Sequence, residues 1–201
     1  NRWNSKACPW EACLRVPMLL RYPRLVPGPR VVDGLVANID VAPTLLEVCG
    51  IPAPETVDGI KQAPVEGTSF AYTFDAENAK APSRHKTQYF EIMGNRAIYH
   101  DGWLANTTPK VPPWAMEGPG GDVASSYHWE LYEIENDYSQ GRNLAAEYPE
   151  KLAEMEQLFL EEAERNNVFP LDDSRGPSRA LRSRVAAALA AVPRDYVYRS
   201  N

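Results

Sequence analysis

The first sixty residues alternate between a short apolar run and proline-rich or polar stretches. Residues 16–22 (VPMLLRY) are apolar and are followed by a proline-rich stretch to about Asp33, which predicts a buried strand that enters a loop. Asp40 suits a helix N-cap because its carboxylate can accept a first-turn N–H, and Gly50 suits a left-handed stop. We therefore predict a helix over residues 40–49. A strand, a loop and a helix in this order are typical of the closing edge of an α/β domain.

A second block of the chain has the pattern of an antiparallel sheet. Three β-prone runs are separated by two-residue hairpin signals, Gly-Asn and Asp-Gly, and occupy residues 88–93, 96–100 and 103–107. A fourth run, residues 128–134, follows a loop rich in proline and glycine, and its Trp and Tyr residues are expected in the core. The pattern predicts a four-stranded antiparallel sheet.

A helix that begins at Pro149 is expected to cover one face of this sheet. Its apolar positions form one stripe, made of Leu152, Met155, Phe159 and Ala163, while glutamates occupy the opposite side. The predicted fold class is therefore an α/β remnant, with a closing strand and helix, followed by an α+β part with a four-stranded antiparallel sheet packed on a helix.

These patterns divide the chain into four parts. Residues 51–86 contain several prolines and scattered polar residues, so they read as surface loop with at most a short helix near residues 69–74. The predicted parts are the end of an α/β domain (1–60), a linker (61–86), an α+β subdomain (87–170) and a tail (171–201) with a helix over residues 178–192.

Composition and charge argue against several classes of function. The chain has 201 residues, of which 44% are hydrophobic and 24% are charged, as in ordinary globular proteins. Its net charge of −6 gives no electrostatic basis for binding nucleic acid. No apolar run is long enough to predict a membrane-spanning helix. The three cysteines fit neither a zinc site nor a disulfide framework, so the compartment, cytoplasmic or periplasmic, stays open.

Several ordered motifs carry the functional signal. Residues 6–17 (KACPWEACLRVP) place a lysine before an aromatic-acidic pair and a Leu-Arg-Val-Pro run, and residues 39–51 (IDVAPTLLEVCGI) contain the pattern Asp-x-x-Pro-Thr-Leu-Leu. Further on, residues 89–103, the run WELYEI at 129–134 and the NLA at 143–145 follow in order. Together these motifs resemble the type I sulfatases, of the arylsulfatase-like branch of the alkaline-phosphatase superfamily, in their C-terminal portion.

This resemblance implies a sulfuric ester hydrolase that acts on sulfate monoesters, either small molecules or sulfated glycans. In the family a Cys or Ser within Cys/Ser-x-Pro/Ala-x-Arg becomes formylglycine, whose hydrate attacks sulfur, while calcium usually holds the sulfate oxygens. None of the three cysteines heads such a motif, and no acidic pair matches the metal ligands. The resemblance therefore implies that the nucleophile and the calcium ligands belong to an upstream part of the same polypeptide, and that this chain alone is inactive.

Lys6 is the one catalytic residue that the resemblance carries over. In the family, a lysine at this spacing reaches the sulfate ester near the bridging oxygen and stabilises charge on the leaving group. Glu11 and Arg15, in the same motif, are expected to form a structural ion pair, and His100 is a weaker candidate for substrate contact. Cys13 and Cys49 are expected to be buried thiols.

Two other functions stay open. A phosphonate or phosphate monoesterase of the same superfamily would use a similar metal and lysine arrangement. A non-catalytic α+β module, derived from a sulfatase and serving interaction, would also explain the missing nucleophile. If the chain is a fragment of a larger domain, we expect exposed apolar surface along Val16 to Leu20, because one strand and one helix of an open sheet cannot cover themselves.

Overall fold

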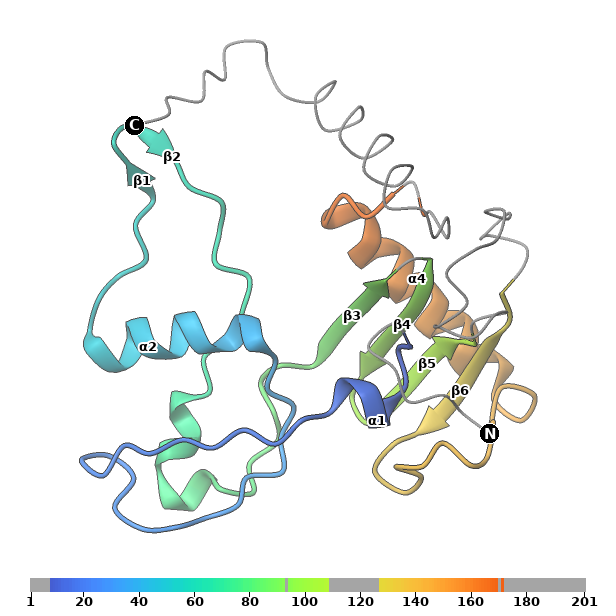
Figure 1. Ribbon diagram of the computed structural model, residues 1–201, viewed down its shortest axis with the longest axis horizontal. Helices are drawn as coiled ribbons and strands as arrows, with labels where there is room; N and C mark the ends of the chain where they lie inside the picture. Colours follow the sequence, from blue (N-terminus) through green and yellow to red (C-terminus); the bar gives the residue numbers. More distant parts are fainter. Residues whose placement is uncertain (1–7, 93, 109–126, 170, 172–201) are drawn as a thin grey trace. The chain divides into compact units, whose positions relative to one another are not determined.

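The computed structural model describes residues 8–92, 94–108, 127–169 and 171, and it divides the chain into two compact units (Figure 1). The sheet unit consists of residues 1–15 and 89–201, and the loop unit consists of residues 16–88. The predicted tail helix over residues 178–192 lies outside the described residues.

The sheet unit contains the predicted four-stranded antiparallel sheet. Its strand order is β3-β4-β5-β6, and the strands are β3 (Thr87–Ile92), β4 (Asn95–His100), β5 (Trp103–Thr107) and β6 (Trp129–Glu133). Asp101 and Gly102 have φ of 44° and 87°, the left-handed backbone that a two-residue hairpin needs. This turn places His100 opposite Trp103, and β6 pairs antiparallel with β5.

Helix α4 (Pro149–Arg165) packs on one face of this sheet, as its apolar stripe predicts (Figure 1). Met155, Phe159 and Ala163 are fully buried, and the ring of Phe159 lies edge-on to Trp129 with 5.5 Å between the ring centroids. Such burial of apolar side chains is the main term that stabilises a small domain. The core of the sheet unit therefore lies between α4 and the sheet.

The other face of the sheet has its own apolar cluster. Because side chains alternate along a strand, the residues next to the α4-facing ones point the opposite way. The cluster consists of Ala97, Leu104, Tyr132 and Ile134, and Leu14 packs against it. Leu14 ends the short helix α1 (Glu11–Leu14), so the segment around the Trp-Glu motif is held on this face.

The loop unit contains the helix predicted over residues 40–49. A single 3₁₀ turn, η1 (Asn38–Asp40), leads into α2 (Val41–Cys49), which stops at Gly50 with φ of 65°. A tight hairpin of β1 (Thr56–Val57) and β2 (Ile60–Lys61) follows, and then the 3₁₀ turns η2 (Ala71–Phe74) and η3 (Ala76–Asn78). The short helix expected near residues 69–74 is therefore a 3₁₀ turn.

The strand predicted over residues 16–22 does not form in this structure. These residues are irregular, and Val16 and Leu19 are 72% and 98% exposed. A strand needs a neighbour to satisfy its backbone N–H and C=O groups, and no described strand pairs with this segment. The expected exposed apolar surface along Val16 to Leu20 is confirmed.

The two units also differ from the predicted division into domains. The segment up to Arg15 belongs with the sheet rather than with residues 16–60. Residues 61–86 are more than a linker, because several of their polar groups bond to residues 35–44. The backbone N–H of Thr68 and the ring of His85 bond to Asp40, and the hydroxyl of Ser83 donates to the carbonyl of Leu35.

Candidate functional site

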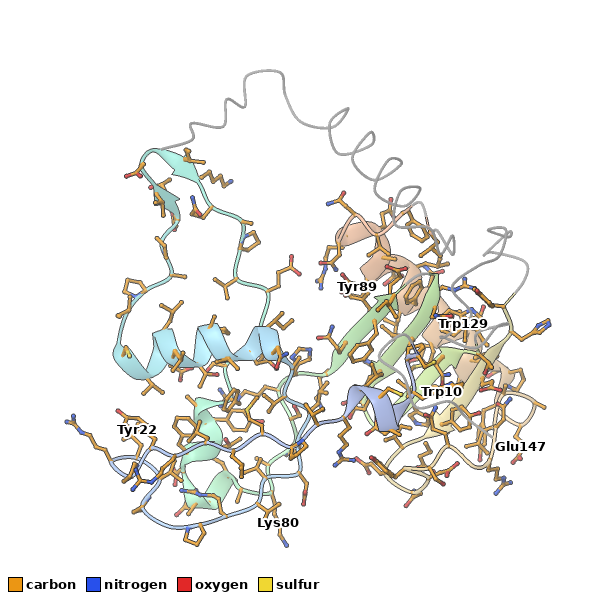
Figure 2. All side chains as sticks on the ribbon, in the orientation of Figure 1. Trp10, Tyr22, Lys80, Tyr89, Trp129 and Glu147 are labelled. Atoms are coloured by element: carbon orange, nitrogen blue, oxygen red, sulfur yellow. The ribbon has the colours of Figure 1, made fainter. Side chains whose placement is uncertain are left out.

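From Cys8 onwards, the chain that follows Lys6 is held on the sheet unit. Lys6 and Ala7 lie outside the described residues. Cys8 and Trp10 are only 1% and 4% exposed. Figure 2 shows Trp10 beside α1. The sequence motif that contains the predicted catalytic lysine is therefore anchored from Cys8 onwards.

Two buried amide side chains connect this segment to the sheet. The backbone N–H of Glu11 donates to Oε1 of Gln140 at 2.8 Å, and Nε2 of Gln140 donates to Oδ1 of Asn106 at 2.8 Å. Gln140 is 2% exposed and Asn106 is 0% exposed. We call these two residues the amide relay. Sequence reasoning missed both, since Gln140 lies in a polar loop and Asn106 is a polar residue that follows three apolar ones on β5.

Glu11 and Arg15 form the structural ion pair that the sequence predicts. Arg15 Nη1 lies 3.4 Å from Glu11 Oε1, and the guanidinium lies over the ring of Tyr138. Burial raises the pKa of Glu11 above its ordinary value, and the charge of Arg15 partly opposes this rise. Glu11 is the buried member of the pair and Arg15 the exposed one, so the pair lies where α1 meets solvent.

His100 occupies the end of β4, next to the hairpin turn. Its Nε2 lies 4.0 Å from Oδ2 of Asp101, and its side chain is 26% exposed. A partly exposed imidazole beside a carboxylate is able to contact a ligand. Its predicted role in substrate binding stays a prediction, because Lys6 is not among the described residues.

The loop unit holds a buried Asp–His pair that sequence reasoning did not find. Nδ1 of His85 lies 2.8 Å from the carboxylate of Asp40, and the backbone N–H groups of Ala37 and Thr68 donate to the same carboxylate at 2.7 Å. Asp40 is 1% exposed and His85 is 8% exposed. Forty-five positions separate the two residues, and no local motif indicates that they meet.

The prediction that the Asp40 carboxylate caps α2 is wrong in its chemistry. Asp40 precedes the helix, but its side chain makes no cap hydrogen bond. The carboxylate instead bonds to the ring of His85. The chain at Gly67 packs closely against the backbone before α2, because a Cβ on Gly67 would collide with the carbonyl of Ile39.

His85 has a structural role rather than that of a general base. Its Nδ1 faces the Asp40 carboxylate, and its Nε2 lies 3.0 Å from the carbonyl oxygen of Thr87. Both partners are acceptor groups of the protein itself, so neither ring nitrogen is turned toward a ligand from which it could take a proton. The Asp40–His85 pair therefore fastens residues 67–87 to the start of α2.

A buried guanidinium lies on the α4 side of the sheet. The guanidinium of Arg96 lies 6.0 Å from the ring centroid of Tyr127 and 5.3 Å from that of Trp129. Burial lowers the pKa of Arg96, and the charge of Glu156 partly opposes this. Burial also raises the pKa of Glu156. These contacts stabilise the core around Trp129.

No cluster of potential metal ligands is present in the described part of the chain. Across residues 8–92, 94–108, 127–169 and 171, no three His, Cys, Asp or Glu residues gather in a way that could hold a metal ion. These residues therefore do not fit a calcium site. The expectation of buried thiols is wrong for Cys49, which is exposed, and only partly right for Cys13; Cys8 is the buried thiol. No helix in this part of the chain is long and apolar enough to span a bilayer.

Known proteins similar to this chain are sulfatases. The family model of the C-terminal part of N-sulphoglucosamine sulphohydrolase matches residues 1–97. An N-acetylglucosamine-6-O-sulfatase of Bacteroides thetaiotaomicron is 27% identical over 164 residues, which cover 79% of this chain and 26% of that protein. An uncharacterized sulfatase of Schizosaccharomyces pombe is 30% identical over 174 residues, which cover 84% of this chain and 28% of that protein.

Solved structures are similar at a lower level. A structure described as a complex with the substrate D-glucosamine-2-N,6-O-disulfate is 20% identical, with a TM-score of 0.44, and the match covers 67% of this chain and 25% of that one. The chain thus spans about a quarter of the length of the relatives that it matches.

Proposed function

Because this chain belongs to the sulfatase family, we propose that it contributes the Lys6 side of an active site that hydrolyses sulfate monoesters. The observation that carries the proposal is the anchored motif around Lys6. The match to the C-terminal family model includes this motif, and residues 8–11 are buried on the sheet unit. A catalytic lysine needs a fixed backbone next to it, because a misplaced group loses much of its effect on rate.

The chemistry proposed for Lys6 is electrostatic. Hydrolysis of a sulfate monoester breaks the bond between sulfur and the bridging oxygen, and the electron pair stays on that oxygen as the alcohol or phenol leaves. The ammonium of Lys6 would stabilise this developing negative charge in the transition state. The products are inorganic sulfate and the free hydroxyl compound.

The remaining groups of the reaction would come from sequence outside these 201 residues. In the family, a formylglycine hydrate supplies the nucleophile and a divalent cation, usually calcium, neutralises the sulfate oxygens. None of the three cysteines heads a Cys-x-Pro-x-Arg motif, the one Ser-x-Ala-x-Arg sequence (residues 178–182) follows the Lys6 motif rather than preceding it, and the described residues hold no metal cluster. We therefore propose that this chain works only as part of a longer polypeptide.

Sulfated sugars are the substrate class that we propose. The support is the name of the Bacteroides relative, an N-acetylglucosamine-6-O-sulfatase, whose similarity extends over most of this chain. A 6-O-sulfated sugar carries its sulfate on an alcohol oxygen. An alcohol is a poor leaving group, so a lysine at the bridging oxygen would matter more than for a phenol.

The test is a comparison of two proteins with three substrates. The 201-residue chain and the gene's full reading frame would be assayed with added calcium on a chromogenic aryl sulfate, the matching aryl phosphate and a phosphonate monoester. We expect turnover only by the longer protein and only, or chiefly, of the sulfate. Preference for the phosphorus esters would favour the phosphatase or phosphonatase alternative. Absence of turnover in both proteins would favour the non-catalytic module.

A further inference from the structure

The amide relay of Gln140 and Asn106 holds the one segment of the sheet unit that leads directly to Lys6. We propose that Gln140 and Asn106 are positioning residues for Lys6: they fix the chain that follows the lysine and thereby its reach toward the ester. This inference rests on the proposed function, since it assigns the relay a role in that reaction.

Gln140 accepts a hydrogen bond from a backbone N–H that has no partner within α1. The first N–H groups of a helix have no partner within it, and Trp10, which precedes α1, provides no side-chain cap. The N–H of Glu11 instead donates to Gln140 across 129 positions of sequence. A lost partner would leave this buried N–H without a hydrogen bond, which favours release of α1 from the sheet.

The far end of the relay lies in the middle of the sheet. Asn106 pairs with Ala97 on β4 and with Glu130 on β6, so it is fixed by strands on both sides. It is fully buried, and its described side-chain hydrogen bond is the one to Gln140. A polar amide at a buried mid-strand position has a desolvation cost that an apolar residue would avoid. In the proposed arrangement, the buried amide of Asn106 serves to hold Gln140 in place.

Gln140 is held in an unusual backbone conformation that aims it at the relay. Its φ is 53°, in the left-handed region that side chains other than glycine avoid. The surrounding loop is fastened by Asp137, whose carboxylate accepts the N–H groups of Gly141 and Arg142 at 2.8 Å. Backbone strain that the surrounding structure maintains is a common mark of a functional position.

The distance to Lys6 is short along the chain. Two residues of fully extended chain span about 7 Å, so the buried position of Cys8 limits where the amino group of Lys6 can reach. Release of α1 would remove this limit. The lysine would then spend less time at the bridging oxygen, and the rate of the chemical step would fall while substrate binding changed little.

The test uses the full reading frame that contains this chain. Gln140→Met keeps the side-chain volume but removes both hydrogen bonds, and Gln157→Met is the matched control, because Gln157 bonds only to the exposed Glu161 on α4. For Gln140→Met we expect kcat to fall about 10-fold or more and KM to stay within about 2-fold. In a Lys6→Ala background the same substitution should change kcat by less than about 2-fold, because the group that it positions is gone.

A second readout reports the segment itself. In a Cys13→Ser, Cys49→Ser background, the buried Cys8 should react faster with a thiol reagent when Gln140→Met is present, and at an unchanged rate with Gln157→Met. If Gln140→Met does not fold, Asn106→Val removes the far end of the relay and is subject to the same expectations.

The outcomes separate this inference from the proposed function. Suppose that Lys6→Ala lowers turnover. The positioning role would then be overturned if the losses of kcat multiply in the double variant. It would also be overturned if kcat and the reactivity of Cys8 are unchanged in Gln140→Met. An unchanged rate in Lys6→Ala would instead overturn the proposed function, and the positioning role with it.

Discussion

Replacing Asp40 with Asn keeps the size of the side chain but removes its charge and one of its two acceptor oxygens. In the folded loop unit that carboxylate faces three donors: the N–H groups of Ala37 and Thr68 at 2.7 Å and Nδ1 of His85 at 2.8 Å. In Asp40→Asn the new NH₂ group faces one of these donors, and the buried ring of His85 loses the charged acceptor that it faces.

The magnitude follows from this burial. A buried donor that loses its acceptor costs about 1–3 kcal/mol, and the carboxylate serves three donors, so we estimate a total loss of about 3–5 kcal/mol. An exposed pair would cost about 0–1 kcal/mol. The estimated loss is a large part of the roughly 5–15 kcal/mol that stabilises an ordinary domain. We therefore expect the contacts between residues 67–87 and the start of α2 to open often.

Hydrogen exchange at the Thr68 amide is the assay, because this N–H donates directly to Asp40. A loss of about 3–5 kcal/mol corresponds to exchange that is roughly 100- to 4,000-fold faster. The control is Glu47→Gln, which makes the same chemical change at an exposed position of α2 and should alter stability by about 0.5 kcal/mol or less. Exchange in Asp40→Asn within about 3-fold of this control would refute the reasoning from a buried pair.

Two further predictions concern the sheet unit. Phe159→Ala should destabilise the unit by about 3–5 kcal/mol, seen as a lower urea midpoint in tryptophan fluorescence, whereas Leu160→Ala, at a 47% exposed position, should cost clearly less; equal losses would contradict the assigned core. Burial raises the pKa of Glu11 in the folded state, so the folded chain binds this proton more tightly than the unfolded chain and stability should fall as pH rises above the ordinary value of 4.5. Glu11→Gln should remove this part of the fall in urea midpoints, and an identical pH dependence in both proteins would show that Glu11 does not cause it.

The elements that sequence reasoning predicted well are those specified by local signals. The hairpin at Asp101-Gly102 needs only two residues with left-handed backbone, and both adopt it. Helix α4 needs only an apolar stripe and a proline in its first turn, and its buried residues are the predicted ones. The ion pair of Glu11 and Arg15 spans one helical turn, so its spacing alone suggests it.

The features that sequence reasoning missed depend on distant partners. The strand predicted over residues 16–22 has the right composition, but a strand forms only where another strand accepts its hydrogen bonds. Asp40 has a side chain suited to a helix cap, and His85 competes for it from a distant part of the sequence. Gln140 reads as a loop residue because its polar neighbours do not indicate that its side chain is buried.

For the same reason, the fold could be predicted from the sequence more fully than the candidate site. The sheet unit could be outlined from periodicity and turn residues, whereas the amide relay required the pairing of β5 with β4 and β6 and the docking of α1. The family resemblance added Lys6, which no pattern of polarity distinguishes from a surface lysine. The proposed role of that lysine is therefore the claim that most needs an experiment.

The most direct measurement is the effect of Lys6→Ala on kcat for a series of sulfate esters whose leaving groups differ in basicity, assayed in the full reading frame. If the ammonium stabilises charge on the bridging oxygen, the loss should reach about 100-fold or more for an alkyl sulfate and should shrink as the leaving group approaches nitrophenol. A loss that is the same for every leaving group, or no loss at all, would contradict the account.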